Sequence, residues 1–236
     1  MKLLVFDTES TDKEPERARL VSAYLGLMDE RGLIGNEATY LVRPEGFTIP
    51  HEAIAVHGIA NEYALKYGWR GADVLDKMAR VIRQECVENG VPICGQNLVY
   101  DLTLLDREMR RHGMAARADW LLPRINVVDT YVLDRRLHPE RRGTRKLVDL
   151  LHYYHLHLDS ANAHDAAWDA YAAGRVALKQ LEHDLLREMP WDVLTEAQAL
   201  WYRDQAAEFA VRARLRGSDE KVNFDWPWIK ETRHAA

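Results

Sequence analysis

The order in which the apolar periodicity changes along this chain restricts its fold more than any other sequence feature. Residues 2–6, 19–29 and 37–42 follow one another as strand-like segments, with a turn at "DERG", which predicts an antiparallel meander. From residue 71 onward, segments with helical spacing alternate with short buried strands, which predicts crossover connections and parallel pairing. We therefore expect an α/β fold with a mixed five-stranded sheet, three strands antiparallel and then two parallel, flanked by helices.

The C-terminal part of the chain has a different character. A helix is predicted at residues 194–217, with Thr195 and Gln198 as a capping pattern and Gly217 as its end. We expect one main domain at residues 1–185, followed by a helical and Trp-rich extension at 186–236. The other predicted helices cover residues 71–90, 101–113, 145–155 and 164–189, and the later predicted strands cover 91–95 and 125–130.

Composition limits the function classes. A net charge of −5 over 236 residues disfavours a wide basic face for nucleic acid, so a polyanion would have to be held locally. One segment suits that role, "RRLHPERRGTRK" at residues 135–146, with six Arg or Lys against one Glu. The sequence shows neither a membrane-length apolar run nor a signal peptide, and two cysteines form no disulfide framework, so a cytoplasmic protein without membrane contact is expected.

Acidic residues at three separate places predict a cation site. Asp7 and Glu9 lie two positions apart at the end of a strand, and therefore point to the same face. Asp101 begins a helix directly after a buried strand, and Asp169 lies one turn into a helix that His164 precedes. Each place alone is typical of an ordinary strand end or helix cap. Together they indicate carboxylates gathered around a hard divalent cation.

Three motifs carry a family resemblance. "DTEST" at 7–11, "NLVYD" at 97–101 and "HDAAWD" at 164–169 resemble, in order and spacing, the motifs of the DEDDh (DnaQ-like) 3′-to-5′ exonucleases, which include bacterial proofreading subunits. "VHGIA" at 56–60 and "VVDT" at 127–130 are similar to further segments of that family. His164 stands five positions before Asp169, whereas the tyrosine branch of the superfamily has Tyr four positions before, so the histidine branch is indicated.

The resemblance implies a fold, a mechanism and a set of site residues. The fold would be ribonuclease H-like over residues 2–183, and the reaction would release nucleoside 5′-monophosphates from DNA 3′ ends that are single-stranded or frayed, as in proofreading or repair. Four carboxylates would hold two Mg²⁺ or Mn²⁺ ions, with His164 as general base. The implied ligands are Asp7, Glu9, Asp101 and Asp169. The residues expected to contact substrate are Thr8, Ser10, Thr11, His57 and Asn97 near the terminal nucleotide, with Arg141 and Arg142 along the strand backbone.

Several alternatives stay open at this point. An exoribonuclease that trims RNA ends would share the same five catalytic residues. A zinc-binding interaction module would instead use His152, His155, His157 and His164, although "HYYHLHL" lacks a second ligand pair. A homodimer or a polymerase partner is also compatible with the sequence. The aromatic residues Phe224, Trp226 and Trp228 would stack on bases, meet a second subunit or pack onto the core.

Overall fold

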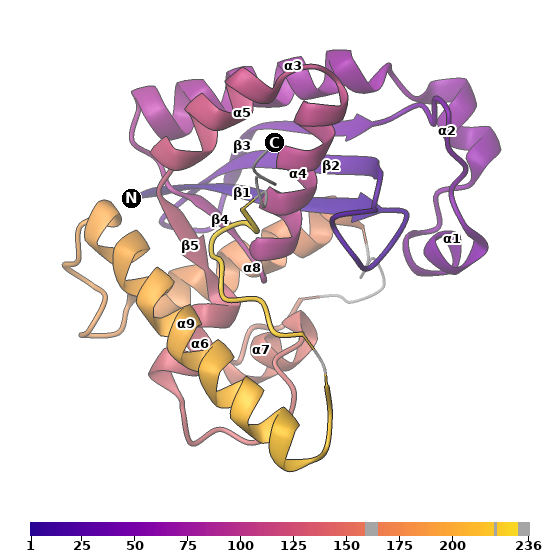
Figure 1. Cartoon of the computed structure of the whole chain (residues 1–236). Coiled ribbons are helices and arrows are strands. Elements are labelled where there is room, and N and C mark those ends of the chain that lie inside the picture. Colours follow the sequence, from indigo (N-terminus) through magenta and orange to yellow (C-terminus); the bar gives the residue numbers. More distant parts are fainter. Residues whose placement is uncertain (159–164, 220, 231–236) are drawn as a thin grey trace.

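The computed structural model describes residues 1–158, 165–219 and 221–230, and it contains the expected mixed sheet (Figure 1). The strand order is β3-β2-β1-β4-β5, with β1, β2 and β3 antiparallel and with β4 and β5 parallel to β1. The central strand β1 thus has the meander on one side and the crossover strands on the other. The strands are β1 (Lys2–Ser10), β2 (Leu20–Asp29), β3 (Ile34–Leu41), β4 (Ile93–Gly95) and β5 (Val127–Asp129).

The helices differ from the sequence prediction mainly in their ends. The helix predicted at 71–90 is α3 followed by a π-helical segment, the one predicted at 164–189 ends at Leu181, and the last one begins at Trp191 rather than 194. Four shorter helices, α1, α2, α5 and α6, were not predicted. The helical bounds are α1 (His51–His57), α2 (Asn61–Tyr67), α3 (Gly71–Ile82), η1 (Arg83–Glu88), α4 (Val99–Arg111), α5 (Ala115–Leu121), η2 (Leu122–Arg124), α6 (Thr130–Leu137), α7 (Leu147–Tyr153), α8 (Ala166–Leu181) and α9 (Trp191–Leu215).

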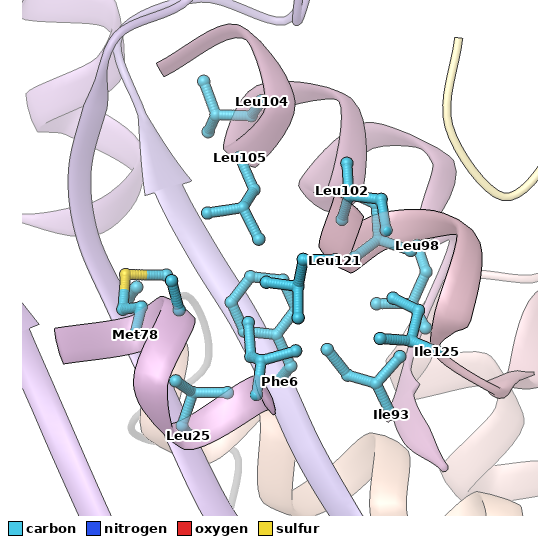
Figure 2. Close-up of a cluster of buried hydrophobic side chains, with 14 of the residues drawn as sticks. Phe6, Leu25, Met78, Ile93, Leu98, Leu102, Leu104, Leu105, Leu121 and Ile125 are labelled. Carbon is cyan, nitrogen blue, oxygen red and sulfur yellow. The ribbon is translucent and has the colours of Figure 1, made fainter. Parts of the chain in front are cut away.

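Alternation along β1 divides the hydrophobic core into two layers. Leu4 and Phe6 point to the face covered by α3, α4 and α5, whereas Leu3 and Val5 point to the face covered by α8. Figure 2 shows Phe6 among side chains from several elements of the first layer, including Met78 of α3. Because the alternation continues to the end of β1, its last polar side chains also point alternately to the two faces.

Small residues allow α8 to lie close against the sheet. A Cβ atom on Gly174 would lie 2.5 Å from Cγ1 of Val5 and 2.7 Å from Sδ of Met28. Ala166, Ala170 and other alanines of α8 are buried in the same layer. The small residues of α8 therefore allow the helix to pack closely on the sheet. This packing brings the first turn of α8 beside the end of β1.

The C-terminal extension completes the edge of the sheet. Thr195 Oγ1 accepts a hydrogen bond from Val127 N at 2.9 Å, and Gln198 Oε1 accepts one from Asp129 N at 2.8 Å. Gln198 Nε2 also donates to Val127 O at 2.7 Å. The interpretation of Thr195 and Gln198 as a helix cap is therefore wrong: both lie inside α9, and their side chains pair with the backbone of β5, which would otherwise be an unpaired edge strand.

The segment after α9 returns to the core, as the packing alternative predicted. Trp226 is only 7% exposed and Trp228 packs against the same cluster, whereas Phe224 is 43% exposed. Ile229 N donates to Thr103 Oγ1 of α4 at 2.8 Å. Among the described residues, no helix combines the length and apolar character that crossing a bilayer requires.

Candidate active site

The end of β1 and the start of α8 bring three carboxylates together. Asp7 and Glu9 continue the α8-facing side of β1 that Leu3 and Val5 begin. One ligand oxygen from each of Asp7, Glu9 and Asp169 lies within 4.8 Å of the other two. Oxygen atoms at such separations are within reach of a single divalent cation.

Asp101 approaches the same place from α4. It lies in the first turn of that helix, is 5% exposed, and accepts a hydrogen bond of 2.5 Å from Thr8 Oγ1. Thr8 points to the α4 side of β1, because it lies between Asp7 and Glu9. Thr8 thus orients the Asp101 carboxylate, and its predicted contact with a nucleotide stays a prediction.

The electrostatics of the cluster favour the binding of a cation. Burial raises the pKa of Asp7 well above its ordinary value, and the charges of Asp101, Asp169 and Glu9 raise it further. Burial, followed by the charges of Asp169 and Asp101, raises the pKa of Glu9 to about 8. Burial also raises the pKa of Asp101 to about 7, against the opposing effect of the Thr8 hydrogen bond. In the absence of a cation the cluster therefore retains protons near neutral pH.

The turn before α4 is held by a residue that sequence reasoning did not single out. Asn97 adopts a φ of 61°, and Asp129 accepts hydrogen bonds from Asn97 N at 2.9 Å and Leu98 N at 3.0 Å. Asp129 also accepts from Tyr131 N at 3.0 Å as the N-cap of α6, and from Trp226 Nε1 at 3.4 Å. Its position at the end of a buried strand and directly before a helix is the sequence signal that identifies it.

The polar residues that follow Glu9 are tied to the local loop. Ser10 Oγ shares a hydrogen bond with the Tyr100 hydroxyl of α4, and Thr11 Oγ1 accepts from Arg19 N at 2.9 Å. Their predicted contacts with a nucleotide stay predictions.

His57 is the last residue of α1, and its Nδ1 accepts from Ile59 N at 3.1 Å. Its Nε2 is buried without a hydrogen-bond partner among the described residues, and burial lowers its pKa. Burial thus favours the neutral ring, and Nε2 is left for a further partner. Its nucleotide contact also stays a prediction.

His164, the predicted general base, lies outside the described residues. Its neighbour Asp165 caps α8, where its Oδ1 accepts from Ala167 N at 2.9 Å. Asp169 N donates to Asp165 O at 2.9 Å, which is the first turn of the helix. Capping by Asp165 therefore fixes the place where Asp169 joins the cluster.

The basic segment at 135–146 is less free than its composition suggests. Arg135 and Arg136 belong to α6, and Arg141 and Arg145 both bind the fully buried carboxylate of Asp134, at 3.0 and 2.8 Å. Arg141 therefore already neutralises a buried charge, whereas Arg142 is exposed. Their predicted contacts with a strand backbone stay predictions.

Among the described residues, the histidines of the zinc alternative belong to no group of side chains with metal-ligand separations. In residues 1–158, 165–219 and 221–230, the group of three or more side chains with metal-ligand separations is Asp7, Glu9 and Asp169. It contains none of His152, His155 and His157.

Comparison with known proteins finds a DNA polymerase by sequence and exonucleases by structure. No family model matches the chain. It is 26% identical over 191 residues to the PolC-type DNA polymerase III of Lacticaseibacillus paracasei. This alignment covers 79% of this chain and 12% of the polymerase. Escherichia coli exonuclease I bound to a dT13 oligonucleotide aligns with a TM-score of 0.60 and 19% identity, over 79% of this chain and 42% of that chain.

Two further exonuclease structures align with this chain to a similar extent. Exonuclease I of Methylocaldum szegediense gives a TM-score of 0.61 at 20% identity, over 78% of this chain and 41% of that one. A 3′-exonuclease that recognises the 3′ end of a histone mRNA stem-loop gives 0.60 at 15% identity, over 78% and 83%. The chain thus spans less than half of each exonuclease I and about an eighth of the polymerase.

These alignments and the strand order define the class of fold as ribonuclease H-like. Within that class the similar structures are exonucleases, so the resemblance that the three motifs predicted is confirmed at the level of the fold.

Proposed function

We propose that this protein is a metal-dependent 3′-to-5′ exonuclease that releases nucleoside 5′-monophosphates from single-stranded or frayed DNA ends. The observation that supports this is the convergence of Asp7, Glu9 and Asp169, joined by Asp101, at the end of the central strand. The exonucleases of similar fold add support to the reaction class.

The acids fit a divalent cation on chemical grounds. All four offer carboxylate oxygens, which Mg²⁺ and Mn²⁺ prefer, and their mutual repulsion leaves the cluster poised for positive charge. Bound there, such cations would activate water and stabilise negative charge at the phosphorus. Asp7, Glu9, Asp101 and Asp169 are the proposed ligands.

The other residues have positioning and proton-transfer roles. Thr8 holds the Asp101 carboxylate, and Asp129 holds the turn at Asn97. We assign His164 as the group that takes the proton of the attacking water, because a neutral imidazole accepts protons at pH 7.

The choice of DNA rests on the "VHGIA" segment, which resembles proofreading relatives more than RNA trimmers. Frayed or single-stranded ends are favoured because a paired terminal base must first leave its stack, at about 1.4 kcal/mol per step. The second candidate is an exoribonuclease, since one exonuclease of similar fold recognises a histone mRNA stem-loop. A homodimer or a polymerase partner stays a prediction.

The test is incubation of the protein with 5′-labelled single-stranded DNA, duplex DNA and RNA, with Mg²⁺, Mn²⁺ or EDTA. We expect a ladder of products shortened from the 3′ end on single-stranded DNA, abolished by EDTA and by Asp101→Asn. Glu45→Gln, an exposed carboxylate change, is the matched control and should retain activity. Faster turnover of RNA would replace the DNA assignment by the second candidate, and full activity of Asp101→Asn would refute the site.

A further inference from the structure

A groove of about 850 Å³ extends from the carboxylate cluster to the C-terminal extension. Asp169, Gln96 and Asn97 line it at the active site. The residues that line it come from α6, the start of α7, α9 and the segment 221–223. Figure 1 shows α6, α7 and α9 gathered on the same side of the sheet, with the yellow C-terminal segment running back from α9 toward α4.

The charge of this groove is opposite to that of the whole protein. Asp169 is the one carboxylate among the described residues that line it, whereas Arg135, Arg145, Lys146 and Lys221 all do so. Arg145 is paired with buried Asp134 at 2.8 Å.

The other three cations have no carboxylate partner among the described residues, and the Arg135 guanidinium lies 5.9 Å from the centre of the Tyr131 ring. Arg135 Nε is buried and has no hydrogen-bond partner within the described part of the chain. Lys146 and Lys221 are exposed and form no ion pair with a described residue. In a protein with a net charge of −5, three cations left without carboxylate partners in one groove indicate an anionic ligand.

The groove also offers flat apolar surfaces and an unused acceptor. Tyr131, Tyr202 and Phe209 line it, and Phe209 is 37% exposed although it is large and aromatic. Gln205 Oε1 is buried without a partner among the described residues, while its Nε2 donates to Val132 O at 3.1 Å. Cations interspersed with aromatic rings are the pattern that binds single-stranded nucleic acid, through phosphates and stacked bases.

We infer that this groove binds the single-stranded segment 5′ of the nucleotide that is removed, and that the C-terminal extension is part of the substrate site. The inference rests on the proposed exonuclease function for the position of the cleaved end. Arg135, Lys146 and Lys221 contact phosphates, and Phe209 with Tyr202 supports bases. The extension therefore has a second role beyond closing the edge of β5: it supplies one wall of the path along which the strand reaches the carboxylates.

The first experiment measures equilibrium binding of a fluorescent oligothymidylate in EDTA at several salt concentrations. Lys146→Ala and Lys221→Ala should each lower the slope of log K against log salt by about 0.7, which is the value for one phosphate contact on a single strand. Phe209→Ala should weaken binding without changing the slope. Lys2→Ala, at the opposite end of β1, is the matched control and should bind as the unmodified protein does.

The second experiment separates this inference from the proposed function. With Mg²⁺, the double variant Lys146→Ala/Lys221→Ala should lower the ratio of kcat/KM for a long oligonucleotide to that for a dinucleotide by about tenfold. An unchanged ratio together with unchanged binding would overturn the inference while leaving the exonuclease intact. If the unmodified protein cleaves neither substrate but the variants still lose oligonucleotide affinity, the proposed function fails and the groove assignment holds.

Discussion

Replacing Glu9 by Gln should stabilise the metal-free protein at alkaline pH and hardly change it in acid. In the folded protein, burial and the charges of Asp169 and Asp101 raise the pKa of Glu9 from 4.5 to about 8. A carboxyl whose pKa is raised by folding binds its proton more tightly in the folded state. Its ionisation therefore destabilises the fold. This destabilisation begins above about pH 4.5 and is complete above about pH 8.

The size of the effect follows from these two pKa values. At about 1.4 kcal/mol for each pKa unit, the difference sets an upper limit of about 5 kcal/mol on the destabilisation. Asp7 and Asp101 take up part of the charge change as Glu9 ionises, so we expect about 2–3 kcal/mol. For a chain of 236 residues this corresponds to a rise in Tm of about 5–10 °C for Glu9→Gln at pH 8.5.

The assay is thermal unfolding in EDTA between pH 4.5 and 8.5, with Glu45→Gln as the exposed control. Glu9→Gln should match the unmodified protein at pH 4.5 and exceed it progressively as the pH rises. Added Mg²⁺ at pH 8.5 should then raise the Tm of the unmodified protein more than that of Glu9→Gln. A Tm difference that is the same at both ends of the pH range would refute the reasoning, because it would not arise from ionisation of this carboxylate.

Three further predictions concern packing, the sheet edge and proton transfer. Gly174→Ala should lower stability by about 1–2 kcal/mol in thermal unfolding, since a Cβ 2.5 Å from Val5 overpacks the core by more than the gain in helix propensity, whereas Gly35→Ala, with nothing within 4 Å, should not. Gln198→Ala should cost about 2–4 kcal/mol in urea unfolding, because it leaves two backbone groups of β5 unpaired, and an equal loss in the exposed Glu196→Ala would contradict this. His164→Ala should lower the cleavage rate by about 10²–10⁴ with Mn²⁺ binding nearly unchanged, and a rate of the unmodified protein that is flat from pH 5 to 8 with chemistry limiting would argue against the histidine.

Local patterns in the sequence determined much of the fold and the membership of the acid cluster. The alternation in residues 2–9 is a property of one strand, so it places Asp7 and Glu9 on one face whatever the rest of the chain does. The change from strand to helical periodicity likewise predicted the three antiparallel and two parallel strands of the sheet. The short helices α1 and α2 were not predicted, because seven residues hold too few turns to show a helical period. In addition, α1 has no buried residue and α2 has only one among its described residues.

What only the tertiary structure decided is how side chains from distant segments pair. Thr195 and Gln198 have the spacing of a helix cap, yet they bind the backbone of β5, and nothing local to residues 195–198 encodes that edge. Arg141 lies in a basic segment that suits phosphate, yet buried Asp134 holds it. The groove depends on the packing of α9 against α6, because only then do Lys221 and Phe209 line it together with the cations of residues 135–146. Spacing fixes the direction of a side chain, whereas its partner is fixed by packing of the whole chain, because burial makes an unpaired polar group costly.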